Sequence, residues 1–407
     1  MKDVAFWRLC VGCGACKYIC PEDKIKLIDV VDYGIRPIID SNDCGDCQEC
    51  LNVCPGYDVE HQNLKASATL ITELLKSFGP ILEIWEGHAA DPEIRFCGSS
   101  GGLITALALY CLQEEGIYGI LHSAADPDYP WKNKTVLSRK RAELLLRTGS
   151  RYSPASPCDG LSQIEAATGP CVFIGKPCDV SGLRKSQLLK PELVPKIALV
   201  MSFFCAGAPS TQGTLDFFKA YSVEPEDVAE MRYRGNGWPG KATVKFKGAE
   251  PDLEVNYKDS WGFIQKYRPF RCYLCPDLTG EFADISFGDP WYREIKEDDP
   301  GHSLILVRTE KGRKMFHKAV SAGYVTADRA DAGILYHSQK NLLRKRQALW
   351  GRLLAMKALG VPTPKLGGFH LFENWLDLPV AEKARSILGT IRRIVQRKYF
   401  IPMEFDT

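Results

Sequence analysis

The chain has 407 residues, a length that predicts two or three domains rather than one. Its composition, 45% hydrophobic and 25% charged, is that of a folded protein and excludes wholesale disorder. The formal net charge of +2 gives no whole-chain reason to expect nucleic-acid binding.

The start of the chain contains no apolar stretch typical of a secretory signal, and the longest apolar run, residues 103–112, is too short to span a bilayer. We therefore expect a cytoplasmic protein. Its 16 cysteines are unusual there, because disulfides are rare in a reducing compartment. Clustered thiols in such a compartment are more often metal ligands or redox groups, so the cysteine content predicts metal sites.

Two copies of one cysteine pattern lie in the N-terminal part of the chain. Each copy spaces four cysteines by two, two and three residues and ends in proline: Cys10, Cys13, Cys16, Cys20 and Pro21 in the first, Cys44, Cys47, Cys50, Cys54 and Pro55 in the second. This is the pattern of bacterial-type ferredoxins, in which the fourth cysteine of each run binds the other cluster. It predicts one 4Fe–4S cluster held by Cys10, Cys13, Cys16 and Cys54, and a second held by Cys44, Cys47, Cys50 and Cys20.

The alternative for this segment is a pair of structural zinc sites. Zinc favours ligands paired as two CxxC motifs, whereas each run here spaces its four thiols differently, so clusters are preferred. Between the runs, residues 25–39 alternate enough to predict a small β-hairpin. We predict a ferredoxin-like α+β module over residues 1–58, able to carry single electrons.

A small-residue turn at residues 99–102 precedes an apolar helix predicted at 103–110. Small side chains let backbone N–H groups approach an anion, and a helix N-terminus favours negative charge, so a phosphate or pyrophosphate suits this turn. The alternative is an ordinary core helix with a glycine-rich start, because the spacing is neither a Walker loop nor a GxGxxG fingerprint.

Strands predicted at 119–122, 171–174 and 197–201 alternate with helices, which predicts an α/β core with a mostly parallel sheet over residues 59–345. Cys178 and Cys205 follow two of these strands, where open α/β sheets place ligands. With the pair Cys272 and Cys275 they make four thiols, enough for a third 4Fe–4S cluster. The alternative is two buried cysteines and an unrelated zinc half-site.

Taken in order, these motifs resemble the coenzyme F-420 hydrogenase/dehydrogenase beta-subunit family, the iron–sulfur flavoproteins. The resemblance covers roughly residues 85–345 and rests on the following residues: Ser99–Gly102 with Thr105, Gly175–Asp179 with Gly182–Arg184, Phe204 and Cys205, Cys272 and Cys275, and Ala283–Ser286 with Gly288, Asp289 and Trp291.

The resemblance implies an FAD and a core 4Fe–4S cluster. It implies that Cys178, Cys205, Cys272 and Cys275 hold that cluster and that the FAD lies along Ser99, Ser100, Gly101, Gly102, Thr105, Gly175 and Lys176. Many members have threonine at the position of Lys176, which predicts a different flavin or substrate environment here. The family's substrates include the deazaflavin coenzyme F-420 and chlorophyll-type tetrapyrroles, and some bacterial members have no assigned substrate.

A helical C-terminal extension is predicted over residues 346–407. Its last helix, from Val380 to about Arg397, is basic and amphipathic. Such a helix can lie on an anionic membrane surface or bind a partner protein. An ordinary packing helix with a solvated face is the favoured alternative.

We predict an FAD-dependent iron–sulfur oxidoreductase that passes electrons between its clusters and FAD to reduce or oxidise an organic substrate, such as coenzyme F-420 or a bacterial biosynthetic intermediate. A ferredoxin-like protein is the expected electron donor or acceptor, and a homo-oligomer is compatible with the sequence. The alternative is a non-catalytic electron-transfer subunit serving a partner enzyme. An iron–sulfur regulatory protein has little support, because no nucleic-acid-binding motif is visible. No residue pattern identifies a catalytic acid or base.

Overall fold

The structure is a computed structural model and describes residues 2–39, 44, 46–61, 70–296 and 298–404. The N-terminal module is built around a hairpin of β1 (Ile25–Val30) and β2 (Gly34–Ile39), in which Ile25 lies opposite Ile39. This confirms the hairpin predicted between the two cysteine runs. Its other elements are α1 (Lys2–Phe6), α2 (Ala15–Ile19), α3 (Glu49–Asn52) and β3 (Asp58–Glu60).

The core is an eight-stranded sheet in the order β14-β4-β13-β12-β8-β7-β5-β6. Its strands are β4 (Glu83–Ala89), β5 (Gly119–Ala125), β6 (Asn133–Ser138), β7 (Cys171–Gly175), β8 (Ile197–Phe203), β12 (Ile285–Gly288), β13 (Ser303–Val307) and β14 (Val325–Arg329). The predicted strands correspond to β5, β7 and β8. Neighbours are parallel from β12 through β8 and β7 to β5, whereas both edges are antiparallel.

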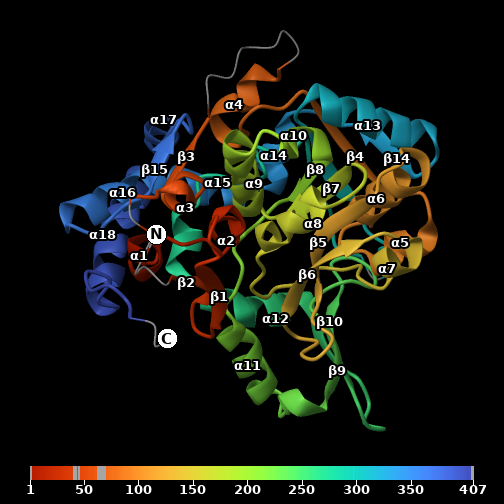
Figure 1. Cartoon of the computed structure of the whole chain (residues 1–407), viewed down its shortest axis with the longest axis horizontal. Coiled ribbons are helices and arrows are strands. Elements are labelled where there is room, and N and C mark those ends of the chain that lie inside the picture. Colours follow the sequence, from red (N-terminus) through yellow and green to blue (C-terminus); the bar gives the residue numbers. More distant parts are fainter. Residues whose placement is uncertain (1, 40–43, 45, 62–69, 297, 405–407) are drawn as a thin grey trace.

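The expectation of a mostly parallel sheet therefore holds only for its centre. Strands β7 and β8 are joined by the helix α9 (Pro177–Leu189), and a crossover of this kind makes neighbouring strands parallel. At one edge β5 continues into β6 without an intervening helix, and β13 returns beside β12 in the same way, so these pairs are antiparallel. The result is a mixed α/β fold (Figure 1).

Side chains that alternate along the central strands face two different helical layers. Val172 and Met201 pack with α6 (Leu103–Glu114) and α13 (Glu310–Ser321). Phe173 and Val200 pack with α8 (Leu161–Glu165), α9 and the ferredoxin-like helix α2. The N-terminal module is thus part of the layer that covers one face of the sheet, and its boundary with the core is a packed interface. Shorter helices complete the layers: α4 (Thr72–Phe78), α5 (Pro92–Cys97), α7 (Arg141–Leu145) and α10 (Leu193–Lys196).

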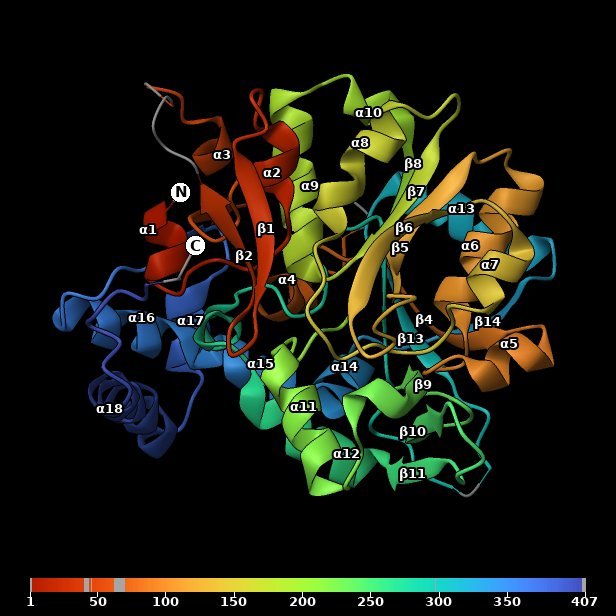
Figure 2. The same ribbon diagram turned by 60° about the horizontal axis from the view of Figure 1, so that its bottom comes forward.

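A smaller antiparallel sheet below the main one was not predicted from the sequence. It consists of β9 (Val228–Arg232), β10 (Lys241–Phe246) and β11 (Leu253–Asn256) and lies with α11 (Thr211–Ala220) and α12 (Tyr257–Ile264) (Figure 2). Phe217 and Phe218 of α11 pack against Val228, Val244 and Ile264 to form its own hydrophobic core. This subdomain supplies one wall of the large cavity described below.

The C-terminal extension packs against the N-terminal module (Figure 1). Its elements are α14 (Gly333–Ser338), α15 (Lys340–Gln347), α16 (Leu349–Ala358), β15 (Lys365–Gly367), α17 (Leu371–Leu376) and α18 (Val380–Gln396). Strand β15 pairs in parallel with β3, where Lys365 lies opposite Asp58. Leu349 of α16 and Ile394 of α18 share an apolar cluster with Leu9 and Cys54. The first and last parts of the chain therefore form one unit.

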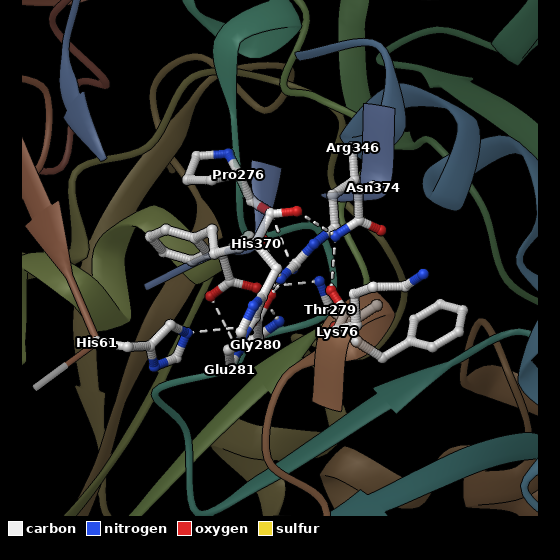
Figure 3. Close-up of polar contacts among 12 residues, drawn as sticks. His61, Lys76, Pro276, Thr279, Gly280, Glu281, Arg346, His370 and Asn374 are labelled. Carbon is white, nitrogen blue, oxygen red and sulfur yellow. Dashed lines mark hydrogen bonds and ion pairs between the residues drawn. The ribbon is translucent and has the colours of Figure 1, made fainter. Parts of the chain in front are cut away.

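A buried ionic network joins the segment after the module, the loop after Cys275 and the C-terminal extension. Glu281 lies at its centre: His61 Nε2 is 2.8 Å from its carboxylate, and Arg346 donates to the other oxygen (Figure 3). Arg346 also donates to the carbonyl of Pro276 at 3.2 Å and to that of Phe369 at 3.1 Å. Burial alone would raise the pKa of Glu281, but Arg346 and His61 hold it at about 2.

We expect Arg346→Met to destabilise the fold by about 3–5 kcal/mol, because it leaves the Glu281 carboxylate buried without its cation. Urea unfolding at neutral pH measures this loss. The double variant Glu281→Gln with Arg346→Met removes both charges and should lose less. A double variant as unstable as the single one would contradict the charge argument.

The same pair predicts an acid-dependent loss of stability. The pKa of Glu281 is about 2 in the folded chain, below the value of about 4.3 expected when unfolded. Its contribution is therefore complete above about pH 5 and is lost as the pH falls from about 4.3 towards 2. Urea midpoints measured across this range should fall less steeply for Glu281→Gln than for the unmodified chain.

Candidate functional site

The first predicted set of four cysteines is brought together beside α2. Cys10, Cys13, Cys16 and Cys54 are all buried. Burial raises the pKa of Cys54 to about 12, with a further contribution from the neighbouring charges of Cys10 and Cys13. Burial and the same group of thiols also raise the pKa of Cys16. Thiols crowded in this way become thiolates only beside a compensating positive charge, which iron would supply.

The second predicted set lies closer to solvent. Cys47 is exposed, and Cys20, Cys44 and Cys50 are partly buried. Burial raises the pKa of Cys50, and the nearby charges of Cys47, Cys20 and Cys44 raise it further. The fourth cysteine of each run thus lies with the other run: Cys54 is near Cys10 and Cys13, and Cys20 is near Cys50. Ligation by either set stays a prediction.

Core residues whose contact with the N-terminal cysteines was not predicted surround the first set. The amide of Cys158 donates to the carbonyl of Cys13 at 3.0 Å, and Ser156 Oγ donates to the carbonyl of Gly12 at 2.6 Å. Gly182 of α9 faces Cys13 so closely that a Cβ atom there would lie 3.1 Å from its sulfur. Cys158 is therefore buried against the first cysteine set.

The third predicted set lines one small cavity of about 80 Å³ in the core. Cys178 lies in the first turn of α9, Cys205 follows β8, and Cys272 and Cys275 come from the 3₁₀ segment Phe270–Leu274 and its end. Burial raises the pKa of Cys205 to about 11, with a contribution from Cys272. Cys10 of the first set lines the same cavity. Among the described residues, no three His, Cys, Asp or Glu side chains are placed to share a single metal ion.

Arg271 connects the first and third sets. Its buried guanidinium donates to the carbonyl of Leu9 at 3.0 Å and to that of Pro55 at 3.1 Å, and it also donates to the carbonyl of Leu274. These three residues directly precede Cys10, follow Cys54 and precede Cys275. One side chain therefore fixes the spacing between the N-terminal module and the core cysteines.

A second cavity, of about 1480 Å³, adjoins the core cysteines. Lys176, Cys205, Gly207 and Ala208 line both cavities, so their backbone forms a shared wall. Six of the residues predicted along the FAD line the larger cavity: Ser99, Ser100, Gly102, Thr105, Gly175 and Lys176. Gly101 is instead packed against the carbonyl of Gly301. The cavity is large enough for a dinucleotide and a second organic molecule.

The turn at residues 99–102 directly precedes helix α6 and lines this cavity. Gly101 and Gly102 have φ angles of 68° and 69°, a left-handed conformation that glycine adopts without strain. Ser100 Oγ donates to the carbonyl of His302 at 2.8 Å, and Ser99 Oγ accepts from the amide of Ser150. The hydroxyls thus hold the turn in place, and the helix N-terminus behind them favours an anion.

The charge of Lys176 is already balanced within the protein. Its ammonium lies 2.7 Å from Asp179 and also donates to the carbonyl of Ala155 at 3.1 Å. Burial lowers the pKa of Lys176, but Asp179, Cys178 and Cys205 together raise it by more, so the amine stays charged. Lys176 therefore supports the start of α9, where Pro177 and Cys178 lie.

Two other cations are better placed to act on the core cysteines. Arg268 donates to the carbonyl of Ala206 at 2.8 Å and Lys345 donates to the same oxygen at 2.7 Å, directly after Cys205. Burial, with a contribution from the neighbouring Arg268, lowers the pKa of Lys345 to about 8. Two adjacent cations of this kind suit a neighbouring negative group. No sequence motif predicted this pair of cations, because Arg268 and Lys345 lie far apart along the chain.

Aromatic side chains from α12 and from the loop after β12 form one wall of the large cavity. Tyr257 stacks on Trp291 with ring centroids 5.5 Å apart, and Trp238 lies 5.4 Å from Trp291. Tyr257 and Trp291 line the cavity, as do Arg234 and Asp289, which form a buried ion pair. This wall is suited to a flat ring.

Sequence comparison assigns this architecture to known families. Residues 84–162 match the N-terminal part and residues 170–332 the C-terminal part of the coenzyme F-420 hydrogenase/dehydrogenase beta subunit, and residues 9–57 match the 4Fe–4S dicluster domain. The chain belongs to the coenzyme F-420 hydrogenase/dehydrogenase beta-subunit family. It is an iron–sulfur electron-transfer protein of that family, and the dicluster match removes the zinc alternative for the N-terminal module.

Individual relatives agree with this assignment. The chain is 27% identical over 296 residues to the coenzyme F-420 hydrogenase subunit beta of Methanococcus voltae. That aligned region is 70% of this chain and 99% of that subunit. It is also 24% identical over 331 residues to the coenzyme F-420-dependent sulfite reductase of Methanocaldococcus jannaschii. That aligned region is 77% of this chain but only 46% of the reductase. This chain thus spans about half the length of that reductase.

A solved structure shares the fold. A chain of the F-420-reducing [NiFe] hydrogenase complex from Methanosarcina barkeri superposes with a TM-score of 0.56 at 23% sequence identity, covering 71% of this chain and 97% of the other. The two chains therefore share the fold of the core. The matched family regions end at residue 332, before the C-terminal extension.

We expect Gly182→Val to disturb the first cysteine set, because its side chain would meet the Cys13 sulfur. Anaerobically purified variant should contain less iron, by about one cluster. Iron and sulfide analysis and the EPR spectrum of the reduced protein measure this change. Gly248→Val, at a position with nothing within 4 Å of the added Cβ, is the matched control and should keep the full iron content.

Proposed function

We propose that this protein passes electrons along a path of three 4Fe–4S clusters to an FAD in the large cavity, and that an organic substrate is reduced or oxidised there. The outer set around Cys47 would exchange electrons with a ferredoxin-like protein, because it is the most exposed of the three. The set that includes Cys10 and Cys54 would come next, followed by the core set. A flavin, when bound, exchanges electron pairs with organic molecules and single electrons with clusters.

The shared cavity wall is the observation that carries this proposal. Cys205 lines both the small cysteine cavity and the large one, and Cys10 of the N-terminal module also lines the small cavity. A chain of neighbouring redox sites needs this arrangement, because electrons pass between groups in close approach. The cations of Arg268, Lys345 and Arg271 would stabilise the more negative, reduced cluster.

A coenzyme F-420 molecule is the first substrate to test. The relatives in Methanococcus voltae and Methanocaldococcus jannaschii are named for this coenzyme. The aromatic wall around Tyr257 and Trp291 offers stacking to a flat ring. A bacterial biosynthetic intermediate is the other substrate class considered for this cavity.

A second candidate is an electron-transfer subunit that serves a partner enzyme. The relatives named as subunits of hydrogenases favour it. Under this alternative the same clusters would be present, but the purified chain would not reduce or oxidise an organic substrate alone. Steady-state assays with the isolated chain, using coenzyme F-420 and a chlorophyllide as acceptors, separate the two candidates.

Anaerobic purification followed by iron, sulfide and flavin quantitation tests the cofactor set. We expect three clusters and one FAD per chain. Cys178→Ser should remove the EPR signal of the core cluster and leave those of the N-terminal pair, because Cys178 lines only the core cavity. Normal iron content and donor-to-flavin electron transfer in this variant would exclude the third cluster. Protein lacking flavin would exclude the FAD.

We expect Arg271→Gln to lower the reduction potential of the core cluster by on the order of 50 mV, because it removes a buried cation beside it. Potentiometric titration followed by EPR measures this shift. Arg271→Lys keeps the charge but loses the three-carbonyl contact, so it should retain most of the potential while slowing reduction of the core cluster by the N-terminal clusters.

A further inference from the structure

The C-terminal extension is much more basic than the rest of the chain. Residues 333–407 contain thirteen Lys and Arg against five Asp and Glu, a net charge of +8, so the remaining residues carry −6. The matched family regions end at residue 332, so this charge lies in a part of the chain that they do not include. The small net charge of the whole chain is therefore the sum of a basic C-terminal extension and an acidic remainder.

Helix α18 carries that face at the edge of the molecule (Figures 1 and 2). Ser386, Thr390 and Ile394 are buried on its inner side. On the outer side Leu388 is 64% exposed and Val395 is 56% exposed, one helical heptad apart. Arg385 and Arg392, also one heptad apart and exposed, form the adjacent row. A row of apolar side chains thus runs beside a row of arginines on solvent-facing surface.

The apolar surface extends past both ends of the helix. Val380, the first residue of α18, is 80% exposed. Phe400 and Ile401, just after the helix, are each 49% exposed, beside the exposed Lys398. Of the twenty large hydrophobic side chains exposed among the described residues, nine lie between Leu354 and Ile401. This concentration marks an interaction surface.

We propose that the outer face of α18, with Phe400 and Ile401, binds the surface of an anionic phospholipid bilayer. A bilayer interface accepts apolar side chains and places lipid phosphates beside basic ones, so both rows of α18 are matched at once. None of the helices in the described part of the chain is long and apolar enough to cross a membrane. The contact is therefore peripheral, with the helix axis along the membrane plane.

The contact has a consequence for electron transfer. The inner side of α18 places Ile394 in the apolar cluster that contains Leu9, Cys10 and Cys54, and Tyr399 packs on Phe270 at a centroid distance of 4.6 Å. A membrane-bound α18 would hold the N-terminal module close to the lipid surface. Membrane-associated electron carriers would then be nearer to the clusters than carriers in bulk solution.

Vesicle co-sedimentation of the full-length, anaerobically purified chain tests this proposal. We expect binding to phosphatidylcholine vesicles that contain about 30% phosphatidylglycerol, weaker binding at high salt, and little binding to pure phosphatidylcholine vesicles. Arg385→Glu with Arg392→Glu should reduce the bound fraction about tenfold or more. Leu388→Asp with Val395→Asp should do the same, because it removes the apolar row.

Leu146→Asp is the matched control, since Leu146 is 82% exposed but follows α7, away from the C-terminal extension. It should bind vesicles like the unmodified chain. The cluster absorbance of each variant verifies folding. Absence of vesicle binding, or binding that the α18 variants leave unchanged, would overturn the proposal. Retention by an acidic redox protein without any vesicle binding would also overturn it and assign the face to a protein partner.

Discussion

The burial of thiols between the N-terminal module and the core is the constraint on which the rest of the structure depends. Four cysteines of the module are buried, so water does not stabilise the negative charge of their thiolates. The surrounding chain therefore has to pack closely around them. Gly182 permits that approach by having no side chain, and Arg271 fixes it through three backbone carbonyls. A module with the same cysteines but a loose interface would separate its clusters from the core.

Charge balance explains the placement of buried cations around the cysteines. Lys176 is neutralised by Asp179 and secures the start of α9, whereas Arg268 and Lys345 meet at a carbonyl beside Cys205. The residue that departs from the family pattern, Lys176, therefore has a structural role within the described fold. The two cations without that role, Arg268 and Lys345, line the large cavity.

The C-terminal extension completes the site as well as covering it. Lys345 of α15 lines the large cavity, Arg346 neutralises the buried Glu281, and β15 extends β3 of the module. At the end of the extension, α18 packs inward on the module and leaves apolar and basic side chains outside. The extension therefore connects the redox interior with the outer surface of the molecule.

Local spacing predicted the two N-terminal cysteine sets, the hairpin at residues 25–39, the central strands and the basic last helix, because these patterns act over a few residues of chain. Only the tertiary structure decided that Cys158 and Gly182 surround Cys13, that Arg271 joins two cysteine sets, and that the sheet is antiparallel at its edges. Contacts of that kind join residues up to 262 positions apart, as between Arg271 and Leu9. They depend on packing of the whole chain, which no local pattern encodes.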